Sequence, residues 1–281
     1  MSCPNCFTGE ALEGTPTGTI SDIDNAAYFS PGPGPQGASA KRAIILLTDI
    51  FGLPLNNARI IADNFAKSLE CDVYVPDLFA GRPAVTPEQM SAIPQRAGLK
   101  VGFLGYLKLF FKVLPSLFAL IRNRPPQGAA RALTFVNKLQ ESKKYEKLGA
   151  IGYCFGGGVS LILGSQHPAL FSSIVIAHPS PPKDAQILGI KAPTAWIAAE
   201  DDFAISKARL DQIEALYRAR EGKDTYVEYK IKVYPGAWRF TFLCSLLTVS
   251  LRPALQYPEV KEAFEKAFQQ AVDWFNRTIP V

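Results

Sequence analysis

The residues best suited to chemistry form a G-x-C-x-G pentapeptide, Gly152-Tyr153-Cys154-Phe155-Gly156. An apolar run precedes it and a small-residue stretch follows it, so strand, nucleophile and helix start are arranged as in a nucleophile elbow, with a thiol in place of a hydroxyl. Glycines are needed there because the sharp turn brings the helix against the strand. We predict that Cys154 is a nucleophile at a helix N-terminus, where the helix dipole lowers the pKa of a thiol. A buried cysteine beside a tight turn is the alternative.

A cluster of carboxylates follows a later strand. Thr194–Ala198 has the composition of a buried strand, and Glu200, Asp201 and Asp202 come directly after it. Enzymes with a nucleophile elbow place an acid and then a histidine base later in the chain. Asp201 is the predicted acid, with Asp202 and Glu200 as alternatives; a solvated loop carboxylate is the simpler interpretation.

Strand-like and helix-like segments alternate along most of the chain. This pattern predicts an α/β protein with a doubly wound, mostly parallel sheet in a single domain, residues 1–281. Catalytic groups in such sheets gather where the strands end. The expected strands are Ala43–Leu47, Val73–Pro76, Leu148–Ile151, Ser173–Ala177, Thr194–Ala198 and Tyr226–Tyr234, after an edge hairpin within Thr17–Phe29; the expected helices are Asn57–Leu69, Ala129–Leu139, Ser206–Arg220 and a last one beginning at Pro258.

Composition excludes several functional classes. Thirty Lys and Arg residues against 25 Asp and Glu give a net charge of +5. The short basic runs at Lys143-Lys144 and Arg218–Arg220 are interpreted as solvated helix ends, so nucleic-acid binding is not expected. Five scattered cysteines argue for a reducing compartment, and the N-terminus lacks the pattern of a signal peptide, so we expect a cytoplasmic protein. Cys3 and Cys6 form a C-x-x-C without a second ligand pair, so neither a metal site nor a redox function is expected there.

Residues 98–124 form an apolar insertion with helical character. Its centre, Val101–Ile121, carries Lys108 and Lys112, and lysines in the middle of a membrane-spanning helix are costly. We therefore expect no transmembrane span. Helices that cap the pocket or cover the sheet are the favoured interpretation, and contact of residues 101–121 with a membrane surface is a further one.

Short motifs over most of the chain carry a family resemblance. They are Cys3-Pro4-Asn5-Cys6-Phe7, Thr48-Asp49-Ile50-Phe51-Gly52, Pro76-Asp77-Leu78-Phe79, Gly152–Gly157, His178-Pro179-Ser180, Glu200-Asp201-Asp202, Tyr234-Pro235-Gly236 and Pro258-Glu259-Val260. With them the chain resembles the dienelactone hydrolase family, particularly its fungal members. The resemblance implies an α/β-hydrolase fold and a Cys-His-Asp triad that hydrolyses a small-molecule lactone or ester without a cofactor, in a monomer or homodimer.

The resemblance also implies roles for individual residues. Cys154 would be the nucleophile and Asp201 the acid. The backbone amides of Ile50 and Phe155 would form the oxyanion hole, in which each donor is worth a few kcal/mol. Asp49 matches a carboxylate beside the nucleophile, and Arg82 matches, more loosely, an arginine that holds the acid group of the substrate.

The chain differs from the family pattern in the segment that would carry the catalytic histidine. The family segment Tyr-Pro-Gly-x-x-His-Gly-Phe is replaced by Tyr234-Pro235-Gly236-Ala237-Trp238-Arg239-Phe240-Thr241. Residues 237–250 form an anomalous apolar segment without a clear helical or strand period. We hypothesise a translated intron or a misplaced splice junction; a catalytically impaired relative, such as a pseudoenzyme or small-molecule binding protein, is the alternative.

Two histidines remain as candidates for the base. His178 ends the strand Ser173–Ala177, at the expected catalytic edge, and is the candidate that we carry forward. A pocket-lining or loop-fixing role is the alternative for it. His167 is expected at the far end of the helix that begins after Cys154, away from the thiol.

Overall fold

An eight-stranded sheet runs through the computed structural model, which describes residues 12, 14–24, 26–33, 41–83, 86, 104, 105, 107, 111, 114, 117–202, 204–239 and 258–280. The strand order is β1-β2-β4-β3-β5-β6-β7-β8. All pairs are parallel except β1 with β2 and β2 with β4. The strands are β1 (Thr19–Ile20), β2 (Tyr28–Ser30), β3 (Arg42–Leu47), β4 (Asp72–Val75), β5 (Lys147–Tyr153), β6 (Ser173–Ala177), β7 (Thr194–Asp202) and β8 (Tyr229–Arg239).

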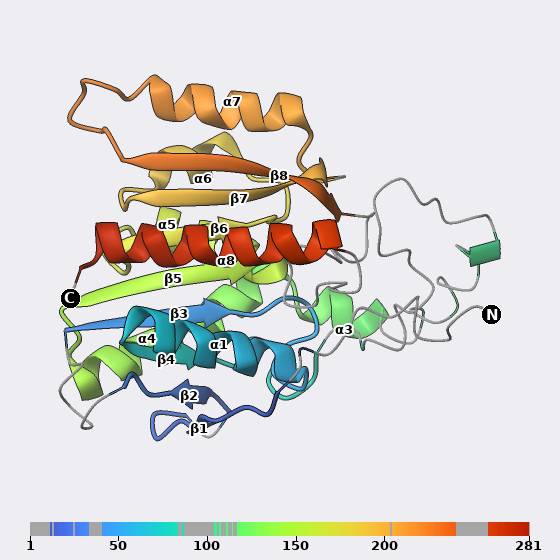
Figure 1. The fold of residues 1–281 in the computed structure, drawn as a ribbon, viewed down its shortest axis with the longest axis vertical. Helices are drawn as coiled ribbons and strands as arrows, with labels where there is room; N and C mark the ends of the chain where they lie inside the picture. Colours follow the sequence, from blue (N-terminus) through green and yellow to red (C-terminus); the bar gives the residue numbers. More distant parts are fainter. Residues whose placement is uncertain are drawn as a thin grey trace.

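Helices cover both faces of this sheet. On one face lie α1 (Asn56–Leu69) and α8 (Pro258–Thr278), in front of the strands in Figure 1. On the other face pack α4 (Pro125–Lys143), α5 (Phe155–Gln166), α6 (Asp184–Gly189) and α7 (Lys207–Arg218). Side chains of β3 alternate between the two cores, Ile44 on the α1 side and Ile45 on the α4 side. The doubly wound, mostly parallel sheet in one domain is therefore as the sequence predicts.

Most element boundaries lie within two residues of expectation, and the larger differences are at α4, β7 and β8. Strand β7 continues to Asp202, four residues beyond its expected end, so Glu200, Asp201 and Asp202 belong to the strand rather than follow it. The edge hairpin is confirmed, because Thr19 of β1 pairs with Phe29 of β2. Helix α4 begins at Pro125, four residues before the expected start, since a proline is tolerated in the first turn of a helix. Strand β8 spans Tyr229–Arg239 rather than Tyr226–Tyr234, and so runs through Pro235-Gly236 alongside β7.

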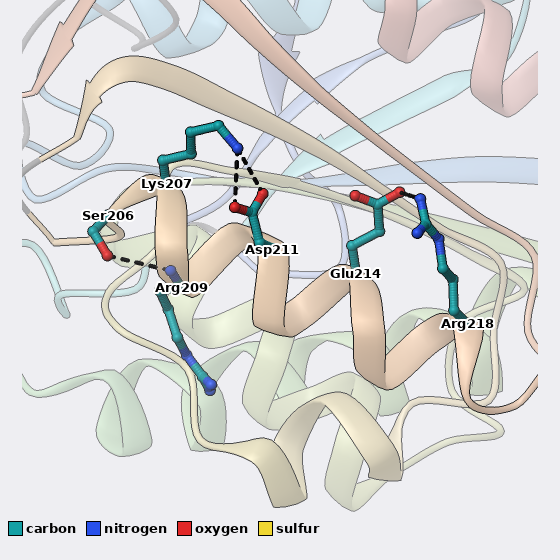
Figure 2. Close-up of polar contacts among 6 residues, drawn as sticks. All are labelled: Ser206, Lys207, Arg209, Asp211, Glu214 and Arg218. Carbon is teal, nitrogen blue, oxygen red and sulfur yellow. Dashed lines mark hydrogen bonds and ion pairs between the residues drawn. The ribbon is translucent and has the colours of Figure 1, made fainter.

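Helix α7 has an N-terminal cap, two ion pairs on its exposed face and an apolar buried face. The Ser206 hydroxyl accepts the Arg209 amide at 3.2 Å and caps the N-terminus. Lys207 pairs with Asp211 at 2.9 Å and Arg218 with Glu214 at 2.7 Å, on the exposed face (Figure 2). Such exposed pairs contribute only a few tenths of a kcal/mol each. The helix is therefore held mainly by its buried face, Leu210, Ile213 and Tyr217.

The interpretation of Arg218–Arg220 as a solvated helix end is wrong for Arg220. Its side chain is buried and donates to the carbonyl of Ile190 at 3.0 Å and to that of Thr225. These two carbonyl groups accept from Nε and Nη2, which offsets part of the cost of burying the guanidinium. The cation therefore joins the end of α6 to the loop before β8, which a charge count along the chain does not reveal.

Two of the segments singled out by sequence are described only in part. Of residues 98–124, helix α3 (Leu117–Arg122) is described, and Leu104, Gly105, Leu107 and Phe111 have helical backbone. Within 237–250, the backbone of 237–239 belongs to β8, so that part has a strand conformation where we expected none; residues 240–250 lie outside the described residues, as do Cys3 and Cys6. Among the described helices, none is long and apolar enough to cross a membrane.

Candidate active site

The turn at Cys154 has the geometry of a nucleophile elbow. Strand β5 ends at Tyr153, Cys154 has φ 55° and ψ −107°, and α5 begins at Phe155. The Cys154 amide donates to the carbonyl of Ala177 at the end of β6, at 3.0 Å, and its carbonyl accepts the Gly158 amide at 3.1 Å. A positive φ at a non-glycine residue costs of order 1–3 kcal/mol and persists only where the surroundings enforce it. The elbow predicted from the pentapeptide is present in the backbone.

The flanking glycines are required by close approach of the backbone. A Cβ at Gly152 would stand 2.1 Å from the carbonyl oxygen of Gly156, and one at Gly156 would stand 2.0 Å from that of Leu47. Real Cβ atoms do not come so close to backbone oxygens. The first turn of α5 therefore packs directly on the end of β3, and this contact holds Cys154 at the carboxyl edge, where the parallel strands end.

Phe155 is held by packing contacts that the local sequence pattern does not predict. Its ring lies 4.8 Å from that of Phe79, in the loop after β4. A Cβ at Gly128 of α4 would approach the Phe155 ring to 2.7 Å, so glycine leaves the slot that the ring fills. Because the ring is fixed on both sides, the amide that Phe155 offers beside the nucleophile is fixed as well.

The turn after β3 carries the other predicted oxyanion donor. Ile50 and Asp49 are buried, and an Asp49 carboxylate oxygen accepts the Phe51 amide at 3.0 Å. Gly52 closes the turn at φ 63°, its amide donating to the Asp49 carbonyl at 3.2 Å. This carboxylate thus shapes the backbone around Ile50, in addition to any contact with a substrate.

Arg82 lies in the loop after β4, at the carboxyl edge of the sheet. The Asp77 carboxylate accepts the amides of Phe79, at 2.8 Å, and Gly81, and so folds the loop. The carbonyl of Arg82 accepts the Asn123 side-chain amide at 3.4 Å. The Arg82 side chain is exposed, which suits a cation that meets an anionic group from solvent.

Glu200 and Asp202, at the end of β7, differ in burial and in hydrogen bonding. Glu200 is exposed, whereas Asp202 is buried and one of its oxygens accepts the amides of Ala204, at 2.8 Å, and Ile205, at 3.2 Å. Asp202 therefore shapes the turn into α7. Asp201 lies between them at an irregularity of the β7 ladder, and its backbone pairs with that of Trp238 on β8.

The two histidines lie at different ends of α5. His167 follows the last residue of this 12-residue helix, so about 18 Å of helix separates it from Cys154. His178 follows β6 and is buried at φ 36°, its ring centroid 6.3 Å from that of Tyr153. Tyr153 belongs to the core beneath α8, whereas Cys154 belongs to the core on the other face. Contact with Tyr153 favours a positioning role for His178, and its role as the base stays a hypothesis.

Sequence reasoning did not find the residues that support the Arg82 loop. Arg131 of α4 donates to the carbonyl of Leu78 at 2.6 Å and to the side chain of Asn123 at 2.9 Å. The contact with Leu78 joins α4 to a loop 53 positions earlier in the chain. Residues so far apart in sequence are recognised as partners only in the folded structure. Among the described residues, no group of three or more His, Cys, Asp and Glu side chains could hold a metal ion.

The environments of Cys154 and Cys71 predict selective alkylation of Cys154. Burial raises the pKa of the Cys71 thiol to about 12, so almost none of it is thiolate at neutral pH. Cys154 is also buried, but it stands at the N-terminus of α5, and the dipole at a helix N-terminus favours a thiolate. We expect iodoacetamide at pH 7.5 to modify Cys154 at least about 10-fold faster than Cys71, measured by peptide mass spectrometry. Equal rates at the two sites would contradict this assignment.

Comparisons with known proteins agree with this geometry. Residues 33–279 match the model of the Dienelactone hydrolase family. Hydrolase tropI of Talaromyces stipitatus is 27% identical over 279 residues, covering 98% of this chain and 95% of that protein. The carboxymethylenebutenolidase homolog of Mus musculus is 26% identical over 284 residues, covering 99% and 97%. The crystal structure of dienelactone hydrolase from Anabaena variabilis has a TM-score of 0.56 at 14% identity, covering 94% of this chain and 99% of that one, and this likeness shows the α/β-hydrolase fold.

Proposed function

Because the chain belongs to the dienelactone hydrolase family, we propose that it cleaves a lactone or ester through the Cys154 thiolate, with Asp201 as the acid of the site. Membership supports a lactone or ester hydrolase as the class of enzyme. The observation that carries the finer proposal is the turn at Cys154, a non-glycine residue at positive φ on a helix N-terminus, fixed between β3 and β6. Strain of this kind clusters at functional sites.

The first step is acylation of the thiolate. The sulfur attacks the carbonyl carbon of the substrate, a C–S bond forms, and the electron pair of the C=O bond moves to oxygen. The amides of Ile50 and Phe155 stabilise this oxyanion. When the carbonyl re-forms, the C–O bond to the leaving group breaks, and the leaving alkoxide takes a proton from water. The product is a thioester on Cys154.

The exposed Arg82 supports a narrower proposal for the class of substrate. A guanidinium at the carboxyl edge binds a carboxylate in a charge-assisted pair. The name of the mouse relative, carboxymethylenebutenolidase homolog, refers to a lactone that bears such a group. The substrate we propose is therefore a lactone or ester that also carries a carboxylate.

Release of the acyl group is the difficult step for this chain. Water must attack the thioester, and a general base accelerates such a step by about 10²- to 10⁴-fold. The family pattern places histidine at the position where this chain has Arg239, and a guanidinium stays protonated and does not act as a base. The chain has only two histidines, and of these His178 alone follows a strand at the carboxyl edge. The thioester is therefore expected to accumulate.

The test is hydrolysis of p-nitrophenyl acetate by the 281-residue chain, beside the Cys154→Ala variant. We expect a burst of about one equivalent of nitrophenolate, followed by slow turnover, and an acetyl group on the Cys154 peptide by mass spectrometry. The Cys154→Ala variant should show neither the burst nor the adduct. A burst that survives this substitution would refute the proposal, and rapid turnover that requires Cys154 would identify a working base, with His178 as the next residue to replace.

A further inference from the structure

The two amides of the proposed oxyanion hole come from different segments of the chain. The Ile50 amide lies in the turn after β3, whereas the Phe155 amide lies at the start of α5. Donors of an oxyanion hole act when they stand about 2.7–3.1 Å from the oxygen that becomes charged. A side chain that packs against both segments would therefore control how well the oxyanion is bound.

The ring of Phe79 packs against both of these segments. Its centroid lies 4.8 Å from that of the Phe155 ring, at an interplanar angle of 40°. A Cβ at Gly52 would stand 2.9 Å from Cδ2 of Phe79, so the ring also lies against the turn that contains Ile50. Phe79 is only 2% exposed, and it shares one hydrophobic core with Ile50, Cys154 and Phe155. The ring thus bridges the two segments that supply the donors.

Hydrogen bonds hold the backbone at Phe79 in place. Its amide donates to the Asp77 carboxylate at 2.8 Å, and its carbonyl accepts the Arg82 amide at 3.2 Å. The carbonyl of the preceding residue, Leu78, accepts Arg131 of α4 at 2.6 Å. Because a close-packed interior transmits a displacement rather than absorbing it, a ring anchored in this way fixes whatever packs on it.

From these contacts we propose that Phe79 is a positioning residue for the oxyanion hole, which keeps the amides of Ile50 and Phe155 at the spacing that the oxyanion requires. The inference rests on the proposed acylation of Cys154. It predicts that Phe79 matters only when charge develops on a carbonyl oxygen. Alkylation by iodoacetamide forms no oxyanion, because the sulfur bonds to a saturated carbon while iodide leaves. That reaction of the same thiolate should therefore not depend on Phe79.

The test compares two reactions of Cys154 in the full chain, acylation by p-nitrophenyl acetate and alkylation by iodoacetamide. In the Phe79→Leu variant we expect the burst to be about 10- to 100-fold slower, because a misplacement of about 1 Å costs up to about 100-fold. Alkylation should stay within about twofold of the parent rate, since it depends on the thiolate. Phe79→Met, which fills the space with a flexible side chain, is the second variant and should slow acylation in the same way.

Phe171→Leu is the matched control. Phe171 is also buried, at 3% exposed, and it precedes β6 at the opposite, amino end of the parallel strands. This variant should react like the parent with both reagents, and thermal melting will show which variants are folded. The proposal is overturned if the folded Phe79 variants acylate at the parent rate, if acylation and alkylation slow equally, or if Phe171→Leu slows acylation as much. A parent chain without a burst would instead refute the acylation of Cys154, and this inference with it.

Discussion

The Arg239→His variant is expected to hydrolyse p-nitrophenyl acetate with sustained turnover, at least about 100-fold faster in the steady state than the parent chain. Counting from Tyr234-Pro235-Gly236, position 239 is where the family pattern has its histidine. The β7–β8 ladder places the backbone of Trp238 opposite Asp201 and that of Arg239 opposite Asp202. An imidazole introduced there joins the strand end that carries the acid, and it would activate water for attack on the thioester.

Two further variants separate base catalysis from loss of a positive charge. Arg239→Gln removes the guanidinium without adding an imidazole, so it should keep the burst of the parent and gain little turnover. The Arg239→His/Cys154→Ala double variant should have no burst and no turnover. If Arg239→His turned over no faster than Arg239→Gln, position 239 would not be the place of the base, and His178 would become the residue to test.

The Gly156→Ala variant is expected to lose about 3 kcal/mol or more of stability. Its Cβ would lie 2.0 Å from the carbonyl oxygen of Leu47 and 2.4 Å from the carbonyl carbon, and both atoms belong to the backbone of β3. A backbone in the middle of a sheet cannot yield as a flexible side chain does, so either α5 or β3 must move. At roughly 2–4 °C for each kcal/mol, the midpoint of thermal unfolding should fall by about 6–12 °C, measured by circular dichroism.

Gly158→Ala is the matched control, two residues further along α5. A Cβ there would meet Ser180 at 3.6 Å and Pro125 at 3.7 Å, which are ordinary contacts. Alanine has a higher helix propensity than glycine, by about 1 kcal/mol, so this variant should be as stable as the parent or slightly more stable. Equal losses from the two substitutions would show that close approach to β3 does not explain the requirement for glycine at 156.

The elbow was predictable because its signals are local. Gly152, Cys154 and Gly156 lie within five residues, and the short distance that demands glycine at 152 arises where β5 turns directly into α5. The short distance at Gly156 is to Leu47 of β3, so its partner was not visible in the local sequence. Strand β3 was predictable for a similar reason, because a continuous apolar run is typical of a strand covered on both faces.

The boundaries of β8 were not predictable from local sequence. Pro235-Gly236 is typical of a turn, yet the strand continues to Arg239 because it pairs with β7 around an irregularity between Ala199 and Asp201. The burial of Arg220 escaped sequence reasoning in the same way, since its carbonyl partner on Ile190 lies 30 positions away. Both features depend on which segments the fold brings together.

The two outer strands of the described sheet bear on its resistance to aggregation. An edge strand offers unpaired amides and carbonyls, on which another chain can add a strand. At one edge, β1 is only two residues long, so the template is short. At the other, β8 carries exposed Lys230 and Lys232, and a second copy that paired along this strand would bring lysines against lysines. One edge is thus protected by its shortness and the other by its charge.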